Sequence, residues 1–595
     1  MVQGGFMIQQ QRSLEINVAE QAAVERLLNT FLRECGIFDP RIMDLPMVFN
    51  DKWKGTPFKI ELKHADKTIY GELSYWSLFG HHGFGSDFYA EWLLTKLVKP
   101  ISNRDVIEWI LDEIASIHES SDTAQKHSQL HKEIHNSIDK TVQYADSFRD
   151  RKSNGANGYP YIQTEQSLIW GHPFHPTPKS SEGFSPDDLS VFPPEMGSAF
   201  QLHYFAVSPD SIAQQYLEEE FEEPVAESVI QQSKGKLGAN QTDYALIPCH
   251  PWQAQYLLQQ SRVGELLQIG KLVYVGPLGD MVYPTSSVRT VWDPEHHYFY
   301  KLPLNVRITN FIRVNTLEQI ERTLAASGLI RSLQNEIENE SFTILLEKGF
   351  RTVSVKHASG DMDEQLLASF AVLFRDNPPE FQDDNPPHVL ASLLEVQPDE
   401  TEPLLFKLIR SQYGNELPDL KQWFRAYAEI TVKPILRLYS EKGVSLEAHV
   451  QNCLLRIHRG MPFTCYVRDL EGVSVSCSHA QQWGWVPTIV QPESPLLYST
   501  DEAWSRLQYY FFVNHIGHLV STLARYGSIE ERQLWGIVAD VLLTMQTNEP
   551  SYLNECIEDL LSRRTLPAKA NLISRFLERG ETPIYVEIPN PMSMR

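Results

Sequence analysis

Residues 285–315, TSSVRTVWDPEHHYFYKLPLNVRITNFIRVN, constrain the fold more than any other stretch of this chain. The run 287–292 is β-branched and aromatic, and the turn-forming residues Asp293-Pro294-Glu295 follow it. Residues 298–302 return as a second extended run, and 306–314 form a third. The pattern predicts neighbouring strands joined by short turns.

This stretch is locally basic in a chain whose formal net charge is −24. Cations on adjacent strands can converge on phosphate or carboxylate oxygens, so the stretch is a candidate anion site. From charge alone, a sheet with a solvated basic face is the stronger alternative. The four basic residues, against two acidic ones, are Arg289, Lys301, Arg307 and Arg313.

The register of the predicted hairpin decides whether two of these cations share a face. A five-residue connection, 293–297, pairs Trp292 with Tyr298 and sets Arg289 opposite Lys301; a four-residue connection separates the two cations. Cations directly opposite each other repel, so the first register favours an anion between them. We expect the first register.

The composition is that of a globular protein and excludes several classes of function. The chain has 595 residues, 42% of them hydrophobic and 22% charged, enough for two to four domains. The acidic balance argues against a nucleic-acid or anionic-membrane partner. Six scattered cysteines fit free thiols in a reducing compartment, and neither a signal peptide nor a membrane span is evident. We expect a soluble, cytoplasmic protein.

The N-terminal part is predicted to be mostly helical. Residues 17–35 and 103–148 have helical apolar spacing, and strands are expected at 58–62 and 68–73. Two segments read as domain boundaries, 153–158 (SNGANG) and the proline- and acid-rich 376–387.

Two further clusters are candidates for chemistry. Gly171–Lys179 is too rich in proline for a helix. His172, His175 and Lys179 either lie on a loop and contact one ligand together, or belong to a rigid proline-rich connection in which the histidines are hydrogen-bonded within the protein. His449, Gln451 and Asn452 precede Asp469 at the end of a strand. A carboxylate there, with an Asn oxygen, can hold Mg²⁺ on nucleotide phosphates. The alternative for His449 is a core histidine whose hydrogen bonds are satisfied within the protein, and the alternative for Asp469 is the cap of a turn.

Taken together, these segments resemble the IucA/IucC family, the siderophore synthetases that work independently of nonribosomal peptide synthetases. The resemblance runs from about residue 165 to Pro589-Asn590-Pro591, in family order. It rests on 287–290 (SVRT), Lys301, 308–313 (ITNFIR), 171–179 (GHPFHPTPK), 250–253 (HPWQ), 447–452 (EAHVQN) and 468–472 (RDLEG).

The resemblance implies an α+β fold of three domains. These are a helical thumb at 1–165, fingers built on an antiparallel sheet at 166–385, and a kinase-like palm with a helical C-terminal part at 386–595. It also implies a homodimer.

The implied activity is siderophore synthesis by an AMP-forming ligase. Such an enzyme uses ATP and Mg²⁺ to adenylate citrate, a citryl derivative or α-ketoglutarate, and then condenses the acyl group with an amine or hydroxyl. The residues of the motifs resemble those of the branch that makes staphyloferrin B-type siderophores. This resemblance favours an α-ketoglutarate-type acid as the substrate. A kinase-like phosphotransferase and a non-enzymatic citrate- or siderophore-binding protein are the alternatives.

The resemblance also assigns roles to residues. ATP would be bound by Ser287, Arg289, Thr290, Lys301 and Gln451, together with His172, His175 and Lys179. Arg313 and His449 would bind the acid and, with Lys301, act in catalysis. Asp469 would hold the metal, and Asn452 joins it by analogy with protein kinases.

Overall fold

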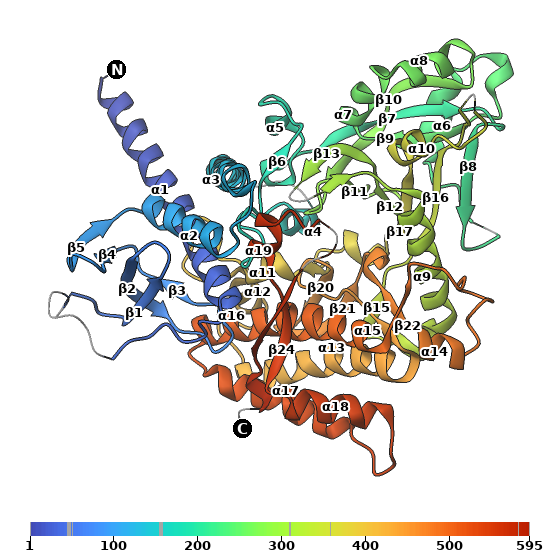
Figure 1. The fold of residues 1–595 in the computed structure, drawn as a ribbon. Helices are drawn as coiled ribbons and strands as arrows, with labels where there is room; N and C mark the ends of the chain where they lie inside the picture. The colour runs from blue at the N-terminus through green and yellow to red at the C-terminus, as the bar shows by residue number, and fades with distance from the viewer. Residues whose placement is uncertain are drawn as a thin grey trace.

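The structure is a computed structural model, and its architecture is shown in Figure 1. It describes residues 2–43, 49, 52–153, 159–219, 221–308, 311–357, 359–580, 582 and 584–593, with the backbone alone at 2–15 and 311. Most of the predicted boundary at 153–158, and Thr309 and Asn310 of the 308–313 motif, lie outside the described residues.

The N-terminal part combines helices with a small sheet. Helix α1 (Val2–Glu34) extends from it toward the N-terminus, and its second half is the helix predicted at 17–35. The predicted helix at 103–148 is divided in two. Helix α2 (Asn103–Ile117) is capped by Ser102 at its start, and the second helix begins only at Thr123. The remaining elements are α3 (Thr123–Ser153), α4 (Pro160–Glu165), β1 (Thr56–Leu62), β2 (Lys67–Tyr75), β3 (Gly83–Phe84), β4 (Phe88–Trp92) and β5 (Leu97–Ile101).

An antiparallel eight-stranded sheet forms the middle part. Its order is β8 (Ile212–Tyr216), β16 (Glu347–Val353), β17 (Val372–Asp376), β12 (Tyr298–Lys301), β11 (Thr290–Trp292), β10 (Leu272–Pro284), β7 (Phe200–Val207) and β9 (Ala245–Cys249). A smaller sheet joins β14 (Phe311–Arg313), β13 (Leu304–Ile308) and β6 (Ser181–Glu182). The helices here are α5 (Asp188–Val191), α6 (Glu227–Lys234), α7 (Pro251–Leu258), α8 (Ser261–Gln268), α9 (Leu317–Ile337) and α10 (Glu364–Phe370).

Three expectations for residues 285–315 were wrong in detail. Thr290 pairs with Lys301, so neither predicted register occurs, although residues 293–297 do separate the two strands as expected. Strand β11 begins only at Thr290, because the residues before it form a turn. The single run expected at 306–314 is instead the antiparallel pair β13 and β14.

The C-terminal part packs three small sheets against helices. The sheets are β15 (Phe342–Ile344), β21 (Met461–Val467), β20 (Cys453–His458) and β18 (His388–Val389); then β19 (Val444–Ser445), β22 (Ser474–Ser476) and β23 (Leu497–Tyr498); then β24 (Thr565–Lys569) and β25 (Tyr585–Pro589). The helices are α11 (Leu390–Leu394), α12 (Leu404–Gln412), α13 (Leu420–Lys442), α14 (Cys477–Gln482), α15 (Thr500–Leu507), the π-helical segment Gln508–Ile516, α16 (Gly517–Gly527), α17 (Glu531–Met545), α18 (Tyr552–Ser562) and α19 (Asn571–Phe576).

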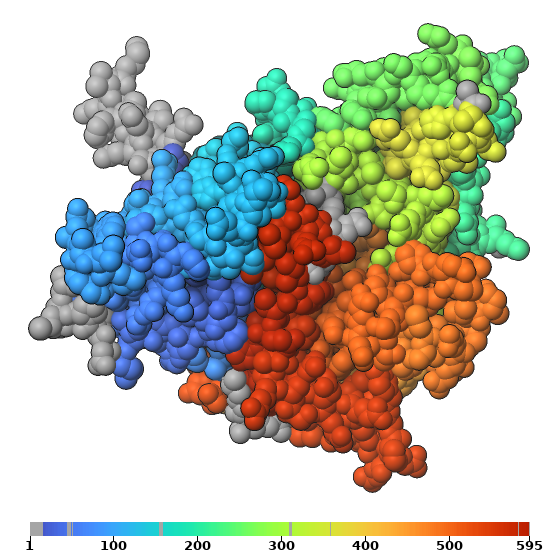
Figure 2. Space-filling model, in the orientation of Figure 1, coloured from blue at the N-terminus to red at the C-terminus, as the bar shows by residue number. Residues whose placement is uncertain are grey.

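The parts meet where the predicted site residues lie. In Figure 2 the surface is hollowed between the red C-terminal segment and the yellow-green surface of the middle part. The chain is thus mixed helix and sheet, as expected, while the division into thumb, fingers and kinase-like palm stays a prediction. In the part of the chain that the structure describes, no helix is long and apolar enough to cross a membrane.

Candidate functional site

A tight turn at Thr285–Thr290 begins the site. The N–H of Val288 donates to the carbonyl of Thr285 at 2.8 Å, and the N–H of Thr290 donates to Ser287 Oγ at 3.1 Å. Val288 has a φ of 69°, which a β-branched residue rarely adopts, and such strain is concentrated at functional sites. The turn presents Ser287 and Arg289 at the start of β11.

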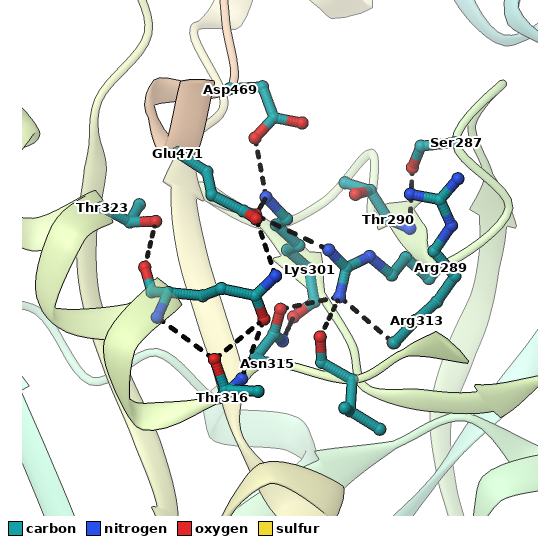
Figure 3. Close-up of polar contacts among 12 residues, drawn as sticks. Ser287, Arg289, Thr290, Lys301, Arg313, Asn315, Thr316, Thr323, Asp469 and Glu471 are labelled. Atoms are coloured by element: carbon teal, nitrogen blue, oxygen red, sulfur yellow. Dashed lines mark hydrogen bonds and ion pairs between the residues drawn. The ribbon is translucent and has the colours of Figure 1, made fainter. Parts of the chain in front are cut away.

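Lys301, Asp469, Glu471 and Arg289 form what we call the Lys301 cluster (Figure 3). Lys301 Nζ donates to Asp469 Oδ1 at 2.6 Å and to Glu471 Oε2 at 2.8 Å. Burial alone would lower the pKa of Lys301, but the two carboxylates outweigh it and raise that pKa. For both carboxyls burial opposes ionisation, yet Lys301 keeps the pKa of each below its usual value.

Arg289 joins this cluster from the other side. Its guanidinium donates to the carbonyls of Arg313 and Val314 at 3.1 and 3.0 Å, and to Asn315 Oδ1 at 2.7 Å. Its Nη2 lies 3.7 Å from Glu471. The predicted convergence of Arg289 and Lys301 therefore occurs although their register was wrong, and Glu471 is the anion between them.

Two site residues were missed by the sequence analysis because they lie in strands that read as ordinary core. Arg375, on β17, donates through Nε to Glu347 Oε1 at 2.7 Å, and its Nη2 lies 3.5 Å from Asp469 Oδ1. Glu347, on β16, is fully buried and accepts the N–H of Leu470 at 3.2 Å. An arginine inside the apolar run 372–376 was the one signal that could have found them.

His449 lies at a sharp bend before β20. Its Nδ1 accepts the N–H groups of Gln451 and Asn452 at 3.2 and 3.3 Å, so the proton of the neutral ring belongs on Nε2. Burial lowers the pKa of His449. Gln451 Nε2 donates to the carbonyl of Ser286 at 3.3 Å, which ties this bend to the turn. Asn452 Nδ2 donates to the carbonyl of Glu447 at 3.1 Å.

A second polar group, also missed, surrounds Glu447. Glu447 Oε1 lies 3.8 Å from His449 Nε2. Lys569 Nζ donates to Tyr510 Oη at 2.7 Å, and burial lowers the pKa of Lys569 while Glu447 raises it. Arg506 donates to the carbonyl of Gly472 at 3.3 Å and is drawn to the same carboxylate. Glu447 belongs to the 447–452 motif, but Lys569 on β24, Arg506 on α15 and Tyr510 in the π-helical segment lie outside every motif.

The loop 171–179 is held firmly beside the site. Glu395 accepts the N–H groups of Ile169, Trp170 and Gly171 at 2.7–3.2 Å. His172 Nε2 contacts Asn514 Nδ2 at 2.8 Å. Burial lowers the pKa of His172 well below its usual value, and His175 and His449 lower it further.

The other two predicted residues of this loop differ in their surroundings. Burial holds the pKa of His175 at about 4, with smaller contributions from Arg575, Arg26 and Arg313. Lys179 Nζ is engaged inside the protein, donating to Glu195 Oε1 and to the carbonyl of Leu168, each at 2.5 Å. Arg313 donates to the carbonyl of Ile308 at 3.2 Å, and burial lowers its pKa to about 10.

The donor set at Asp469 suits a hard divalent cation. Mg²⁺ in phosphate-transfer sites is commonly held by one or two carboxylates with phosphate and water, and Asp469 and Glu471 supply two carboxylates. Among the described residues, no cluster of three or more His, Cys, Asp or Glu side chains could hold a metal ion.

Comparison with known proteins places most of the chain beside named families and enzymes. The IucA / IucC family model matches residues 160–395, and a model described as ferric iron reductase FhuF-like transporter matches residues 421–584. The chain is 38% identical to the L-2,3-diaminopropanoate–citrate ligase of Staphylococcus aureus, over 97% of this chain and 96% of that protein. It is 28% identical to the spermidine-citrate ligase of Bacillus anthracis, over 97% and 98% of the two chains.

The fold is also found in a solved structure. ATP-bound aerobactin synthetase IucA of Klebsiella pneumoniae superposes with a TM-score of 0.82 at 23% identity, over 96% of this chain and 99% of that one. The relatives are named as ligases and synthetases, so the chain is an enzyme of the ligase class. It belongs to the IucA/IucC family, whose members make siderophores by joining a carboxylic acid to an amine.

Proposed function

We propose that this enzyme activates a carboxylic acid as its acyl-adenylate and transfers the acyl group to an amine, with ATP as the energy source. The observation that carries the proposal is the Lys301 cluster. A protein of net charge −24 gathers buried cations from adjacent strands at a strained turn, beside two carboxylates that can hold a metal. Such a pairing suits a metal–polyphosphate ligand.

The turn and the Lys301 cluster supply the nucleotide end of the site. Ser287, Thr290 and Arg289 line the turn, and Lys301 can exchange its carboxylate partners for phosphate oxygens. When bound, Mg²⁺ would be held by Asp469, with Glu471 beside it and Asn452 as the second predicted ligand, and would neutralise phosphate charge. Gln451 and the loop with His172, His175 and Lys179 complete the predicted nucleotide contacts.

The reaction balances without any further reactant. A carboxylate oxygen of the acid attacks the α-phosphorus of ATP, the bond from that phosphorus to the bridging oxygen breaks, and pyrophosphate leaves. The amine nitrogen then attacks the acyl carbon, the bond from that carbon to AMP breaks, and the nitrogen loses its proton to give the amide.

The protein positions the acid for this chemistry. Arg313 supplies a cation for a carboxylate, and the neutral His449, protonated on Nε2, donates a hydrogen bond to the acid or to the developing phosphate charge. Arg506 and Lys569 add two cations around Glu447, near His449, which suits an acid with more than one carboxylate.

The names of the relatives favour citrate as that acid, since both ligases described above are named for it. The α-ketoglutarate-type acid expected from the motif wording is the alternative. A primary amine of the kind that those ligases join to citrate is the expected nucleophile.

The purified enzyme tests the proposal directly. With ATP, Mg²⁺ and citrate it should release pyrophosphate and AMP, and more slowly or not at all with α-ketoglutarate; adding 2,3-diaminopropanoate or spermidine should then give an amide. ADP with a phosphorylated product would identify a phosphotransferase instead. Tight citrate binding without nucleotide turnover would identify a binding protein.

The setting of the reaction follows from the same family likeness. We expect a homodimer acting in the cytoplasm, where ATP and the acid are available. A solution mass of twice 68.3 kDa would support the dimer.

A further inference from the structure

Glu165, the last residue of α4, is a buried carboxylate that the chemistry above does not use. Its Oε1 accepts Tyr161 Oη–H at 2.8 Å and a very short hydrogen bond from Arg468 Nη1, while its Oε2 accepts the N–H of Ser286 at 3.0 Å. The side chain of Glu165 is fully buried and that of Arg468 is 6% exposed. The pair is therefore shielded from solvent and from salt.

These contacts close into a ring of four residues from four segments of the chain. Arg468 Nη2 donates to the carbonyl of Gln451 at 3.0 Å, and Gln451 Nε2 donates to the carbonyl of Ser286 at 3.3 Å. Ser286 and Arg468 then both return to Glu165. We call this the Glu165 ring.

Members of the ring stand directly beside the predicted nucleotide and metal residues. Ser286 precedes Ser287 in the turn, and Arg468 precedes Asp469. The turn lies in the middle part of the chain and Asp469 lies in the C-terminal part. The carboxylate of Glu165 therefore links the two elements that, in the proposed function, bind the same triphosphate. Burial and Arg468 act in opposite directions on the pKa of Glu165, and its pKa is lowered, so the carboxylate is charged.

We propose that Glu165 is a positioning residue that fixes the Ser287–Arg289 turn relative to Asp469. This inference rests on the proposed nucleotide site and adds to it a residue that touches neither nucleotide nor acid. Without the ring, the turn and Asp469 would still be present but would no longer be held at one separation, and small misplacements weaken multipoint binding of a polyanion.

The test measures nucleotide binding alone, so that it does not depend on adenylation. Removing only one charge would leave the other buried and unpaired, so the variant is Glu165→Gln with Arg468→Gln, which keeps hydrogen-bonding amides in place of both charges. Calorimetric titration with Mg·ATP should give a Kd raised about tenfold or more. Thermal melting should show a folded protein.

A matched control separates positioning from general destabilisation. Glu531 is also a buried carboxylate that joins two segments, accepting Tyr75 Oη–H at 2.6 Å and the N–H of Leu78 at 3.0 Å, but it contacts no residue of the site. Glu531→Gln should lower the melting temperature without changing the Kd for Mg·ATP. An unchanged Kd in the double variant, or an equal rise in the control, would overturn the inference.

A second variant covers the case in which the double variant does not fold. Glu165→Asp keeps the charge and the pairing with Arg468, but its shorter side chain cannot also reach the N–H of Ser286. Its Kd for Mg·ATP should rise at least threefold, and a wild-type value would refute the proposal. If the wild-type enzyme binds Mg·ATP but forms no AMP, the proposed function fails while this comparison still stands.

Discussion

Asp469 concentrates the constraints of the site in one residue. Its backbone has a φ of 71°, a left-handed conformation that costs about 1–3 kcal/mol in most residues and less in Asp or Asn. Its carboxylate lies 2.6 Å from Lys301 Nζ and 3.5 Å from Arg375 Nη2. Backbone and side chain are therefore both fixed before any substrate arrives.

Asp469→Asn should separate the charge of this residue from its shape. Asn adopts the same backbone conformation, and Lys301 keeps Glu471 as a partner, so the melting temperature should change little. Acid-dependent pyrophosphate release should fall about 100-fold, because the metal loses its charged ligand. The control is Asp376→Asn on the other face of β17, where the carboxylate pairs with Lys348, and its activity should stay at the wild-type level. An equal loss of activity in the control, or wild-type activity in Asp469→Asn, would contradict the assignment.

Gly472→Ala should disturb the second polar group. An added Cβ would lie 1.7 Å from Glu447 Oε2, so this carboxylate must leave its place beside His449. We expect the KM for citrate to rise about tenfold, as for loss of one charged contact. Gly536→Ala is the control, since its Cβ meets nothing within 4 Å in α17, and activity should be unchanged. Equal effects in both variants would argue against a role for Glu447.

At the scale of elements, alternation along strands decides what reaches the site. Arg375 on β17 and Lys301 on β12 face Asp469, whereas Asp376 turns to the opposite face. The elements themselves were predicted well where apolar periodicity is strong, as in the second half of α1, in β1 and in β2. Arg375 was marked only by its charge within an apolar run, and Arg506 and Lys569 could not be predicted, because only tertiary pairing brings these isolated residues to the site.

Local turn chemistry explains the remaining errors. The start of β11 depends on the turn at Thr285–Thr290, where Val288 adopts a backbone conformation that no β-branched residue signals in a sequence. The domain boundaries at 165 and 385 stay predictions.

The loop held by Glu395 gives a prediction about pH. Burial raises the pKa of Glu395 from 4.5 to about 7, so between these values the folded state binds more protons than the unfolded state, and stability falls as pH rises. Glu395→Gln removes this term. As the pH rises from 5 to 8, the free energy of unfolding of the variant, measured by urea unfolding, should increase by up to about 3 kcal/mol relative to that of the wild type. A difference independent of pH would show that Glu395 does not titrate in this range.

At the scale of the whole molecule, local and global charge oppose each other. The surroundings of the site are cationic, but the protein carries a net charge of −24 and citrate and ATP are anions. At low ionic strength, when the Debye length is long, the proposed substrates interact at a distance with the net charge of the protein rather than with the Lys301 cluster.

Salt should therefore accelerate substrate capture. Raising the ionic strength from 0.01 to 0.15 M shortens the Debye length from about 30 to about 8 Å. Because the long-range repulsion is screened, kcat/KM for citrate should increase about two- to threefold, measured at saturating Mg·ATP. A decrease would mean that the cations of the site dominate the encounter even at long range.

Strand β15 has a consequence for how the enzyme turns over. Its residues pair with β21 in the four-stranded sheet β15–β21–β20–β18. Only Leu345 and Leu346 separate it from β16, which belongs to the eight-stranded sheet. The two sheets are therefore joined by a connection of two residues, which limits how far they can move apart. Any opening between the two sheets during turnover therefore requires a bend at Leu345–Leu346, where the chain passes from one sheet to the other.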